Sequence, residues 1–275
     1  MRTPAASVDS AVWRHTGEAA GRRFVPEETA VAFSYDGGTY AVMMATPQDL
    51  EDFALGFSLT EGIVSTPADI RQLDVVTFDA GIELRMWLAE PRAGALIQRR
   101  RHLAGPTGCG LCGIESLEEA VRALPGIADE THFAPAQILQ ALDALSPRQE
   151  LNRQTRAVHA AAFSHPDAGL VALREDIGRH NALDKLAGAL AHGAVSPRGG
   201  MVVLTSRVSV EMVQKTAVIG APLIVAVSAP TALAIRTAEA AGITLVAVAR
   251  SDGFEVFSHP QRIKESKSET VSNVA

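Results

Sequence analysis

Between residues 157 and 257, short apolar runs of strand length alternate with segments of helical periodicity. Strands that alternate with helices form a largely parallel sheet with helices on both faces. We therefore expect an α/β fold of three layers with a mostly parallel sheet. The predicted strands are Val158–Phe163, Leu170–Leu173, Met201–Leu204, Leu223–Val227, Ile243–Ala249 and Glu255–Phe257, and the predicted helices are Ala182–Leu190, Val210–Val218 and Thr231–Ala240.

The N-terminal part has a different pattern, which predicts a smaller α+β domain over residues 26–125. The tripeptide Asp36-Gly37-Gly38 separates two strand-like runs and is typical of a hairpin turn. Pro47 opens a helical pattern, and two further strand-like runs surround Asp79-Ala80-Gly81. We expect the rest of the chain to divide into a flexible arm (1–25), a larger domain (126–263) and a disordered tail (264–275).

Composition and charge limit the partners and the compartment. The net charge of −6 over 275 residues gives no general basic surface, so nucleic acid is not an expected partner. The N-terminal segment lacks the apolar core of a signal peptide. The longest uncharged run, Thr216–Ile235, is broken by Gly220, Pro222 and Pro230, which argues against a membrane span. We expect a cytoplasmic protein whose thiols stay reduced.

The only two cysteines of the chain, Cys109 and Cys112, lie in the stretch TGCGLCG within an expected mobile loop (99–114). Glycines keep both sulfurs sterically open, and the arginines at 99–101 would stabilise a thiolate, the reactive form of cysteine. Half a zinc site is the main alternative, with ligands completed by histidines such as His102, His132 or His159. A thioredoxin-like redox pair is another. The residues alone leave these alternatives open.

Two other regions could hold a site, because ligands of α/β proteins bind beyond the carboxyl ends of strands. The first is the strand-to-helix junction at 174–181, where Asp176, Arg179 and His180 gather; its alternative is a capped turn with salt bridges. The second comprises the strand ends at 204–209 and 248–253, which could grip phosphate or simply form turns. Glu211 and Lys215 are spaced as an (i, i+4) ion pair. The common nucleotide motifs and the nucleophile elbow are absent from the sequence.

Several long motifs occur in an order that resembles the FdhD family of formate dehydrogenase accessory sulfurtransferases. They are MMATPQDLEDFALGFSLTEGI (43–63), TGCGLCG (107–113), VHAAAF (158–163), REDIGRHNALDKLAG (174–188), SRVSVEMVQK (206–215), VSAPTALAI (227–235) and SHPQR (258–262). The resemblance covers roughly residues 28–263, and motifs of this length are highly specific.

The resemblance implies a sulfur carrier. Such proteins accept sulfur from a cysteine desulfurase as a cysteine persulfide and pass it to the bis(molybdopterin guanine dinucleotide) cofactor of formate dehydrogenase. It implies Cys109 as the persulfide cysteine and Cys112 as its companion. It also implies a cofactor-binding turn at Val248, Ala249, Arg250, Ser251, Asp252 and Gly253, and a homodimer. The rival hypothesis is a non-catalytic chaperone for the molybdenum cofactor, in which both cysteines are incidental.

The family's larger domain is similar to the cytidine deaminase fold, which permits an independent check. Zinc deaminases carry a His or Cys followed by Ala-Glu at one helix start and Pro-Cys-x-x-Cys at the next. The corresponding positions here are His180-Asn181-Ala182 and Ser206–Ser209, so the catalytic Glu and both cysteine ligands are missing. We therefore expect no zinc and no other metal, and infer a cleft for an anionic nucleotide lined by Arg179, His180 and Arg207.

Overall fold

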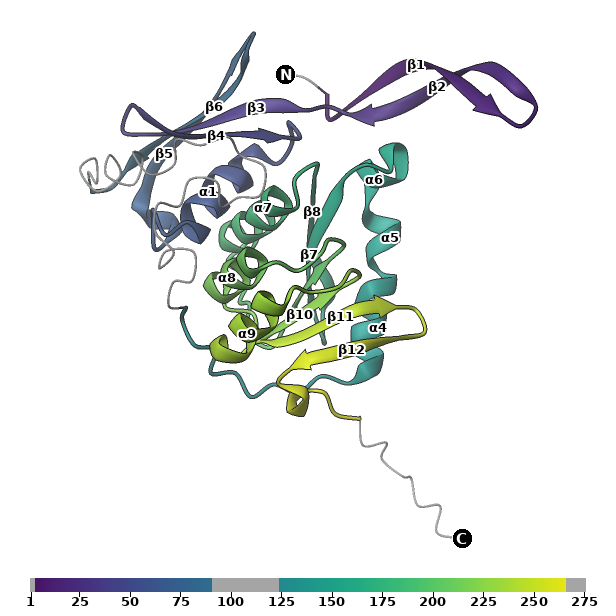
Figure 1. Ribbon diagram of the computed structural model, residues 1–275. Coiled ribbons are helices and arrows are strands. Elements are labelled where there is room, and N and C mark those ends of the chain that lie inside the picture. Colours follow the sequence, from purple (N-terminus) through teal and green to yellow (C-terminus); the bar gives the residue numbers. More distant parts are fainter. Residues whose placement is uncertain (1–2, 91–123, 266–275) are drawn as a thin grey trace.

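The computed structural model describes residues 3–90 and 124–265 and has three parts (Figure 1). A long hairpin at the N-terminal end leads into a small domain with one sheet and one helix, and a larger α/β domain follows. The predicted cysteine loop (99–114) lies outside the described residues, as does most of the predicted tail (264–275). The mobility of both segments and the domain boundary near residue 125 stay predictions.

Where the sequence predicts a loose arm, the structure has an antiparallel hairpin of β1 (Ala5–Arg14) and β2 (Gly17–Pro26). A tight turn at His15 and Thr16 joins the strands, and Gly17 adopts a φ of 110°, which favours glycine. A Cβ at Gly21 would lie 2.6 Å from Cγ2 of Val12 on the opposite strand, so a larger residue there requires the Val12 side chain to move. The sequence pattern does not predict this hairpin, because its two strands carry too few large apolar residues to show the alternation typical of strands.

The small domain agrees with the sequence pattern. Its sheet has the order β4-β3-β6-β5, in which β3 and β6 run parallel and the other pairs antiparallel. Helix α1 (Leu50–Thr60) covers one face, and the aromatic rings of Phe33, Phe53 and Phe57 pack together between helix and sheet. The strands are β3 (Thr29–Tyr35), β4 (Gly38–Ala45), β5 (Ile70–Phe78) and β6 (Gly81–Leu88), with a short 3-10 helix at Pro67–Asp69.

The large domain contains one six-stranded sheet of order β12-β11-β10-β9-β7-β8, together with six α-helices among the described residues. All the strands and helices predicted between residues 157 and 257 are present. The strands are β7 (His159–His165), β8 (Gly169–Asp176), β9 (Met201–Leu204), β10 (Leu223–Ala226), β11 (Thr244–Arg250) and β12 (Gly253–Ser258). The helices are α4 (Pro135–Asp143), α5 (Leu145–Arg148), α6 (Glu150–Thr155), α7 (Arg179–His192), α8 (Val210–Ile219) and α9 (Ala232–Ala241), followed by a 3-10 helix at Pro260–Arg262.

The six-stranded sheet is mixed, so the prediction of a mostly parallel sheet is wrong. Only β9, β10 and β11 pair in parallel within this sheet, whereas β7–β8, β7–β9 and β11–β12 are antiparallel. Loop length explains the difference, because a parallel connection needs a crossover of about a dozen residues or more. The connections from His165 to Gly169 and from Arg250 to Gly253 are far too short for that.

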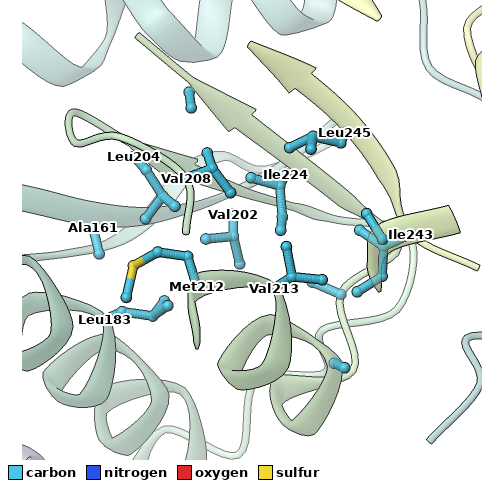
Figure 2. Packing of buried hydrophobic residues seen from close by; sticks show 14 of the residues in the cluster. Ala161, Leu183, Val202, Leu204, Val208, Met212, Val213, Ile224, Ile243 and Leu245 are labelled. Carbon is cyan, nitrogen blue, oxygen red and sulfur yellow. The ribbon is translucent and has the colours of Figure 1, made fainter. Parts of the chain in front are cut away.

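Alternate residues of the central strands point to two separate cores, as strand geometry requires. On one face, Val202 and Ile224 pack against Met212 and Val213 of α8, in a core shared with α7 and α9 (Figure 2). On the other face, Val203 and the neighbouring strand residues pack against α4 and α5. The three-layer arrangement that the sequence predicts is therefore present.

Helices α1 and α7 join the two domains at a very close crossing. A Cβ at Gly56 would lie 1.7 Å from the carbonyl oxygen of Asp184, and one at Gly188 would lie 1.9 Å from the carbonyl oxygen of Asp52. Neither position can therefore hold a larger residue without moving a backbone. This contact fixes α1, and with it the small sheet, against the helix that begins at the candidate site.

Candidate functional site

The ends of five strands meet at one edge of the large sheet. Because β9, β10 and β11 are parallel, their carboxyl ends lie together there. Strand β7 runs the opposite way, so its first residue, His159, reaches the same edge and pairs with Asp176 at the end of β8. We call this the strand-end site and define it as His159, Asp176–His180, Thr205–Ser209, Val227–Thr231 and Val248–Gly253.

Hydrogen bonds between the loops hold this edge in one arrangement. The Thr205 hydroxyl accepts from the backbone N–H of Ala160 at 2.9 Å. The Val208 backbone donates to the Ala229 carbonyl at 3.3 Å and accepts from Thr231 N–H at 3.0 Å. Val248 N–H donates to the Ser228 carbonyl at 3.3 Å. The two regions that the sequence selects, 174–181 and the later strand ends, thus form one surface.

Most polar groups of the segment 174–185 serve the structure. The buried Asp176 carboxylate accepts from the Lys185 ammonium at 2.7 Å, the Asn181 amide at 2.9 Å, Gly178 N–H at 2.7 Å and Thr46 N–H at 3.0 Å. The neighbouring charged residues of the segment are likewise paired: Arg174 with Asp52, and Glu175 with the backbone at the start of α6. For these residues the alternative hypothesis, a capped turn with salt bridges, is confirmed.

Arg179, His180 and Ser209 are the exceptions at this edge. Arg179 Nε, His180 Nε2 and Ser209 Oγ are buried and have no hydrogen-bond partner within residues 3–90 and 124–265. A buried polar group left unpaired costs about 1–3 kcal/mol, so three at one edge of a sheet require a reason. Arg179 and His180 are among the site residues predicted from the sequence. Ser209 lies within the motif SRVSVEMVQK (206–215), which carries the family resemblance.

Two helices present uncapped amino ends to the same site. Gly178 precedes α7 and Ser209 precedes α8, and neither makes a side-chain hydrogen bond to its helix. In contrast, the Thr231 hydroxyl caps α9 by accepting from Ala234 N–H at 3.2 Å. The first N–H groups of a helix and its positive dipole end favour anions. The strand-end site therefore has the donors and the polarity of an anion site.

The two histidines here are neutral at physiological pH. Burial, followed by the neighbouring Arg179 guanidinium, lowers the pKa of His180 to about 3. Burial and Arg179 also lower the pKa of His159. A neutral imidazole can donate from one nitrogen and accept at the other. Positive charge at the site thus comes from the arginines (Arg179, Arg207 and Arg250) and the helix ends, and His180 offers a hydrogen bond.

The other predicted site residues differ in how far they face the site. Arg207 is exposed, and Val248 is partly exposed with a φ of 52°. The Ala249 side chain lies in the core beneath α4, so only its main chain is available to a ligand. The Arg250 guanidinium donates to the carbonyls of Val227 and Ala249, which holds it against the end of β10. Ser251 and Asp252 form the turn itself, and Gly253 begins β12.

The sequence pattern misses a second buried network between the domains. Lys215 donates to Asp184 at 2.8 Å, Glu61 at 2.9 Å and the Thr60 hydroxyl at 3.0 Å. The predicted (i, i+4) pair of Glu211 and Lys215 is therefore wrong, because the Lys215 ammonium has other partners. Burial alone would lower the pKa of Lys215, but the carboxylates of Asp184 and Glu61 outweigh it and raise that pKa. The ammonium stays charged and links α8 to α7 and α1.

Two further observations concern metals and membranes. Among the residues that the structure describes, no group of three or more His, Cys, Asp or Glu side chains is arranged to hold a metal ion. Cys109 and Cys112 lie outside those residues, so the zinc alternative for the cysteine pair is untested. Over the same described ranges, every helix is too short or too polar to traverse a bilayer.

Comparison with known proteins places these features in a family. The model of the FdhD/NarQ family matches residues 26–264, which is most of the chain. The chain belongs to the FdhD/NarQ family. The sulfur carrier protein FdhD of Agrobacterium fabrum (strain C58 / ATCC 33970) is 56% identical over 246 residues, covering 89% of this chain and 91% of the relative. The sulfur carrier protein FdhD of Brucella abortus biovar 1 (strain 9-941) is 54% identical over 254 residues, covering 92% and 94%.

A solved structure has the same fold as this chain. The crystal structure of a candidate formate dehydrogenase accessory protein from Desulfotalea psychrophila superposes with a TM-score of 0.73 at 26% identity. The match covers 94% of this chain and 99% of that one. The FdhD/NarQ match includes the strand-end site and the Cys109–Cys112 stretch, but it begins only at the last residue of the β1–β2 hairpin.

Proposed function

We propose that this FdhD-family chain is a sulfurtransferase that serves formate dehydrogenase. Cys109 accepts persulfide sulfur from a cysteine desulfurase and passes it to the bis(molybdopterin guanine dinucleotide) cofactor of that enzyme. Two relatives more than 50% identical over about nine tenths of the chain are named sulfur carrier proteins, and the solved relative is named for formate dehydrogenase. We place this reaction in the cytoplasm, where cysteine thiols remain reduced.

The first step is a thiolate exchange. The Cys109 thiolate attacks the outer sulfur of the desulfurase persulfide, a new S–S bond forms on Cys109, and the desulfurase cysteine leaves as thiolate. Electrons balance without an external oxidant, because one S–S bond replaces another. The arginines at 99–101 favour the thiolate and the persulfide anion.

The second step must deliver sulfur at the oxidation level of sulfide. The Cys112 thiolate can attack the inner sulfur of the Cys109 persulfide, forming a Cys109–Cys112 disulfide and releasing hydrosulfide to the acceptor. The two cysteine sulfurs supply the two electrons that the released sulfur gains and are themselves oxidised to the disulfide, which a cellular dithiol of the thioredoxin class then reduces. In the alternative, Cys112 only shields the persulfide, and a different thiol supplies those electrons.

The strand-end site is the proposed binding site for the guanine nucleotide of the cofactor that accepts the sulfur. The unpaired polar atoms of Arg179, His180 and Ser209 and the uncapped starts of α7 and α8 together suit a phosphate-bearing ligand. This cluster of unpaired atoms is the single observation in the structure that carries the proposal. Arg207 and the turn Val248–Gly253 would border the same ligand. When bound, the cofactor supplies the metal centre that receives the sulfur.

The large domain is proposed to be of the cytidine deaminase-like type. The supporting feature is an antiparallel strand, β7, inside a sheet that otherwise continues in parallel through β9, β10 and β11. Of the helix starts that carry zinc ligands in deaminases, the first keeps a histidine, His180, and the second has Ser209 and neither cysteine ligand. A scaffold without the two cysteine ligands and the catalytic Glu leaves room at the same place for an anionic nucleotide.

Sulfur loading tests the proposal directly. Each variant, Cys109→Ala and Cys112→Ala, is incubated with a cysteine desulfurase and free cysteine, and its intact mass is measured. We expect Cys112→Ala to gain the mass of one sulfur atom and Cys109→Ala to gain none. Loading of Cys109→Ala would refute Cys109 as the acceptor. The chaperone alternative predicts that a variant lacking both cysteines still restores formate dehydrogenase activity in a deletion strain.

A further inference from the structure

The sheet of the small domain has one covered face and one open face. Helix α1 packs on the face that carries Val31 and Phe33, between this sheet and the large domain (Figure 1). Side chains alternate along a strand, so Ala30 and Ala32 of β3 point to the opposite face. In the described part of the chain, no helix or strand lies on that face (Figure 1). We call it the outer face.

Large apolar side chains gather on the outer face. Val42 and Met44 of β4 pair with Ala32 and Ala30, while Phe78 of β5 and Trp87 of β6 alternate with core residues and share their side of the sheet. Their exposed fractions are 53% for Val42, 49% for Met44, 50% for Phe78 and 36% for Trp87. The solvated face of such a sheet is ordinarily polar. An apolar cluster in this place marks an interaction surface.

The small domain that carries this face is strongly acidic. Residues 26–90 contain twelve Asp and Glu residues but only two basic residues, Arg71 and Arg85, which gives a net charge of −10 in a chain whose total is −6. Pairs with the large domain, such as Asp52 with Arg174 and Glu61 with Lys215, account for a small part of this excess. Exposed acids also border the outer face: Glu28 and Asp36 lie at the two ends of β3, and Asp74 lies on β5. The surface therefore suits a partner that combines an apolar patch with basic side chains.

The outer face adjoins the strand-end site. The Met44 carbonyl accepts from the Asn181 amide at 2.9 Å, and Thr46 N–H, just after β4, donates to the Asp176 carboxylate at 3.0 Å. Asp176 and Asn181 flank the segment that contains Arg179 and His180. The side of the outer face formed by β4 is thus joined directly to the site proposed for the nucleotide.

This position indicates which partner the outer face serves. A cofactor held at the strand-end site is handed over to apo-formate dehydrogenase, so the apo-enzyme must approach this part of the molecule. The cofactor carries several phosphate groups, and a protein cavity that receives it must present positive charge. An acidic surface next to the departing cofactor complements the basic entrance of such a cavity.

We propose that the outer face is the docking surface for apo-formate dehydrogenase, through an apolar patch of that enzyme bordered by basic side chains. This inference rests on the proposed function of the chain. Four strands of about eight residues span about 19 Å by about 26 Å, or roughly 500 Å². A standard interface buries roughly 800 Å² on each partner, so the outer face and its acidic border give a contact of the smaller, transient class. A contact that must dissociate after the cofactor is handed over needs no more.

Binding of the full-length chain to immobilised apo-formate dehydrogenase, prepared without molybdenum cofactor, tests the surface. We expect at least a tenfold higher dissociation constant for Val42→Lys and for Phe78→Ser. The matched controls are Val171→Lys on β8 and Val218→Ser on α8, both valines 38% exposed on the large domain, and they should bind like wild type. Absence of binding by wild type, or equal affinity of the outer-face variants and their controls, overturns the proposal. Near-ultraviolet circular dichroism confirms that each variant is folded.

Charge reversal tests the chemistry of the partner. We expect Asp74→Lys to weaken binding at least fivefold, because it places a cation opposite basic side chains. Asp143→Lys, at an exposed position at the end of α4, is the control and should bind like wild type. Binding of wild type should also weaken as NaCl is raised from 50 to 500 mM. Binding that is insensitive both to salt and to Asp74→Lys would contradict a basic partner.

Cross-linking separates the possible occupants. The chain with p-benzoylphenylalanine in place of Phe78 is mixed with apo-formate dehydrogenase, a cysteine desulfurase and a ¹⁵N-labelled wild-type copy, and then irradiated and digested. We expect cross-links to peptides of apo-formate dehydrogenase. Cross-links predominantly to the desulfurase or to the labelled copy would overturn the assignment.

Sulfur loading distinguishes a failure of this inference from a failure of the proposed function. Val42→Lys should gain sulfur from the desulfurase as fast as wild type, because the outer face is assigned to the acceptor enzyme. Slower loading of Val42→Lys would assign the face to the donor and refute the proposal. If wild type gains no sulfur but the outer-face variants still lose affinity for apo-formate dehydrogenase, the sulfurtransferase function is wrong and the docking surface is supported.

Discussion

The ammonium of Lys185 lies 2.7 Å from the carboxylate of Asp176, and both side chains are completely buried. Asp176 ends β8 and accepts from Thr46 N–H, while Lys185 also donates to the Thr46 carbonyl at 2.9 Å. The pair therefore connects the strand before the strand-end site, the helix after it and the small domain. A buried ion pair of this kind fixes an arrangement more than it adds stability.

Lys185→Met should destabilise the protein by about 3–5 kcal/mol, because it leaves the Asp176 carboxylate buried and uncompensated. Denaturation with guanidinium, followed by fluorescence, measures the loss. Adding Asp176→Asn should restore part of the lost stability, because it removes the uncompensated carboxylate charge.

The matched control for this change is Arg22→Met, which breaks the exposed Arg22–Asp9 pair of the hairpin. An exposed pair contributes about 0–1 kcal/mol, so the control should stay near wild type. If Lys185→Met is no worse than Arg22→Met, the buried pair does not hold the domains as we infer.

The α1–α7 crossing gives a second prediction. Gly188→Ala places a methyl group against the Asp52 carbonyl, and a backbone oxygen cannot move aside as a side-chain end can. Overpacking of this kind costs about 1–3 kcal/mol, and the short approach favours the upper end of that range. We expect a lower melting temperature and faster proteolysis between the domains.

Gly38→Ala is the control for that change, since the nearest heavy atom to its added Cβ would be 3.6 Å away. It should cost little. Equal effects of the two changes would mean that glycine flexibility, and not the helix crossing, determines the result.

Local rules were enough to predict much of the fold. The turn at Asp36 and Gly37 has positive φ at both residues, as the Asp-Gly-Gly signal requires. The strand and helix pattern after residue 157 likewise follows from periodicity alone. Strand direction did not follow from periodicity, because it depends on loop length: the short connections around β8 and β12 force antiparallel pairing.

The candidate site was predictable in part. Arg179 and His180 stand out because they are polar residues at a strand-to-helix junction. Their neighbours Asp176 and Lys185 look equally suited to chemistry, and only the tertiary structure shows that these two satisfy each other. The (i, i+4) rule, which holds on exposed helices, predicts that Lys215 pairs with Glu211. Because Lys215 is buried against α1, its ammonium instead pairs with Glu61 and Asp184.

Arg179 provides a test of the nucleotide site. If the strand-end site holds a guanine nucleotide, Arg179→Gln should weaken binding of guanosine diphosphate at least tenfold, or about 1.4 kcal/mol, measured by calorimetry. Arg236→Gln on the exposed face of α9 is the matched control and should bind like wild type. If Arg179→Gln and Arg236→Gln bind guanosine diphosphate with equal affinity, Arg179 does not contact the nucleotide.

His180 makes the stability of the protein depend on pH. Its pKa in the folded protein is about 3, below the usual value near 6.5, because burial and Arg179 oppose its protonation. The unfolded chain therefore takes up a proton that the folded chain excludes, and stability falls as pH drops from about 6.5 toward 3. Between pH 7 and pH 5 this one group should remove about 2 kcal/mol.

The variant His180→Gln keeps a polar side chain but cannot take up that proton, so its free energy of unfolding should fall by about 2 kcal/mol less over the same interval. His159 contributes in the same direction in both proteins and cancels from the comparison. His15→Gln, in the exposed turn of the hairpin, is the control and should follow the wild-type curve. If wild type and His180→Gln lose stability in parallel between pH 7 and pH 5, His180 is not the buried neutral group at the start of α7.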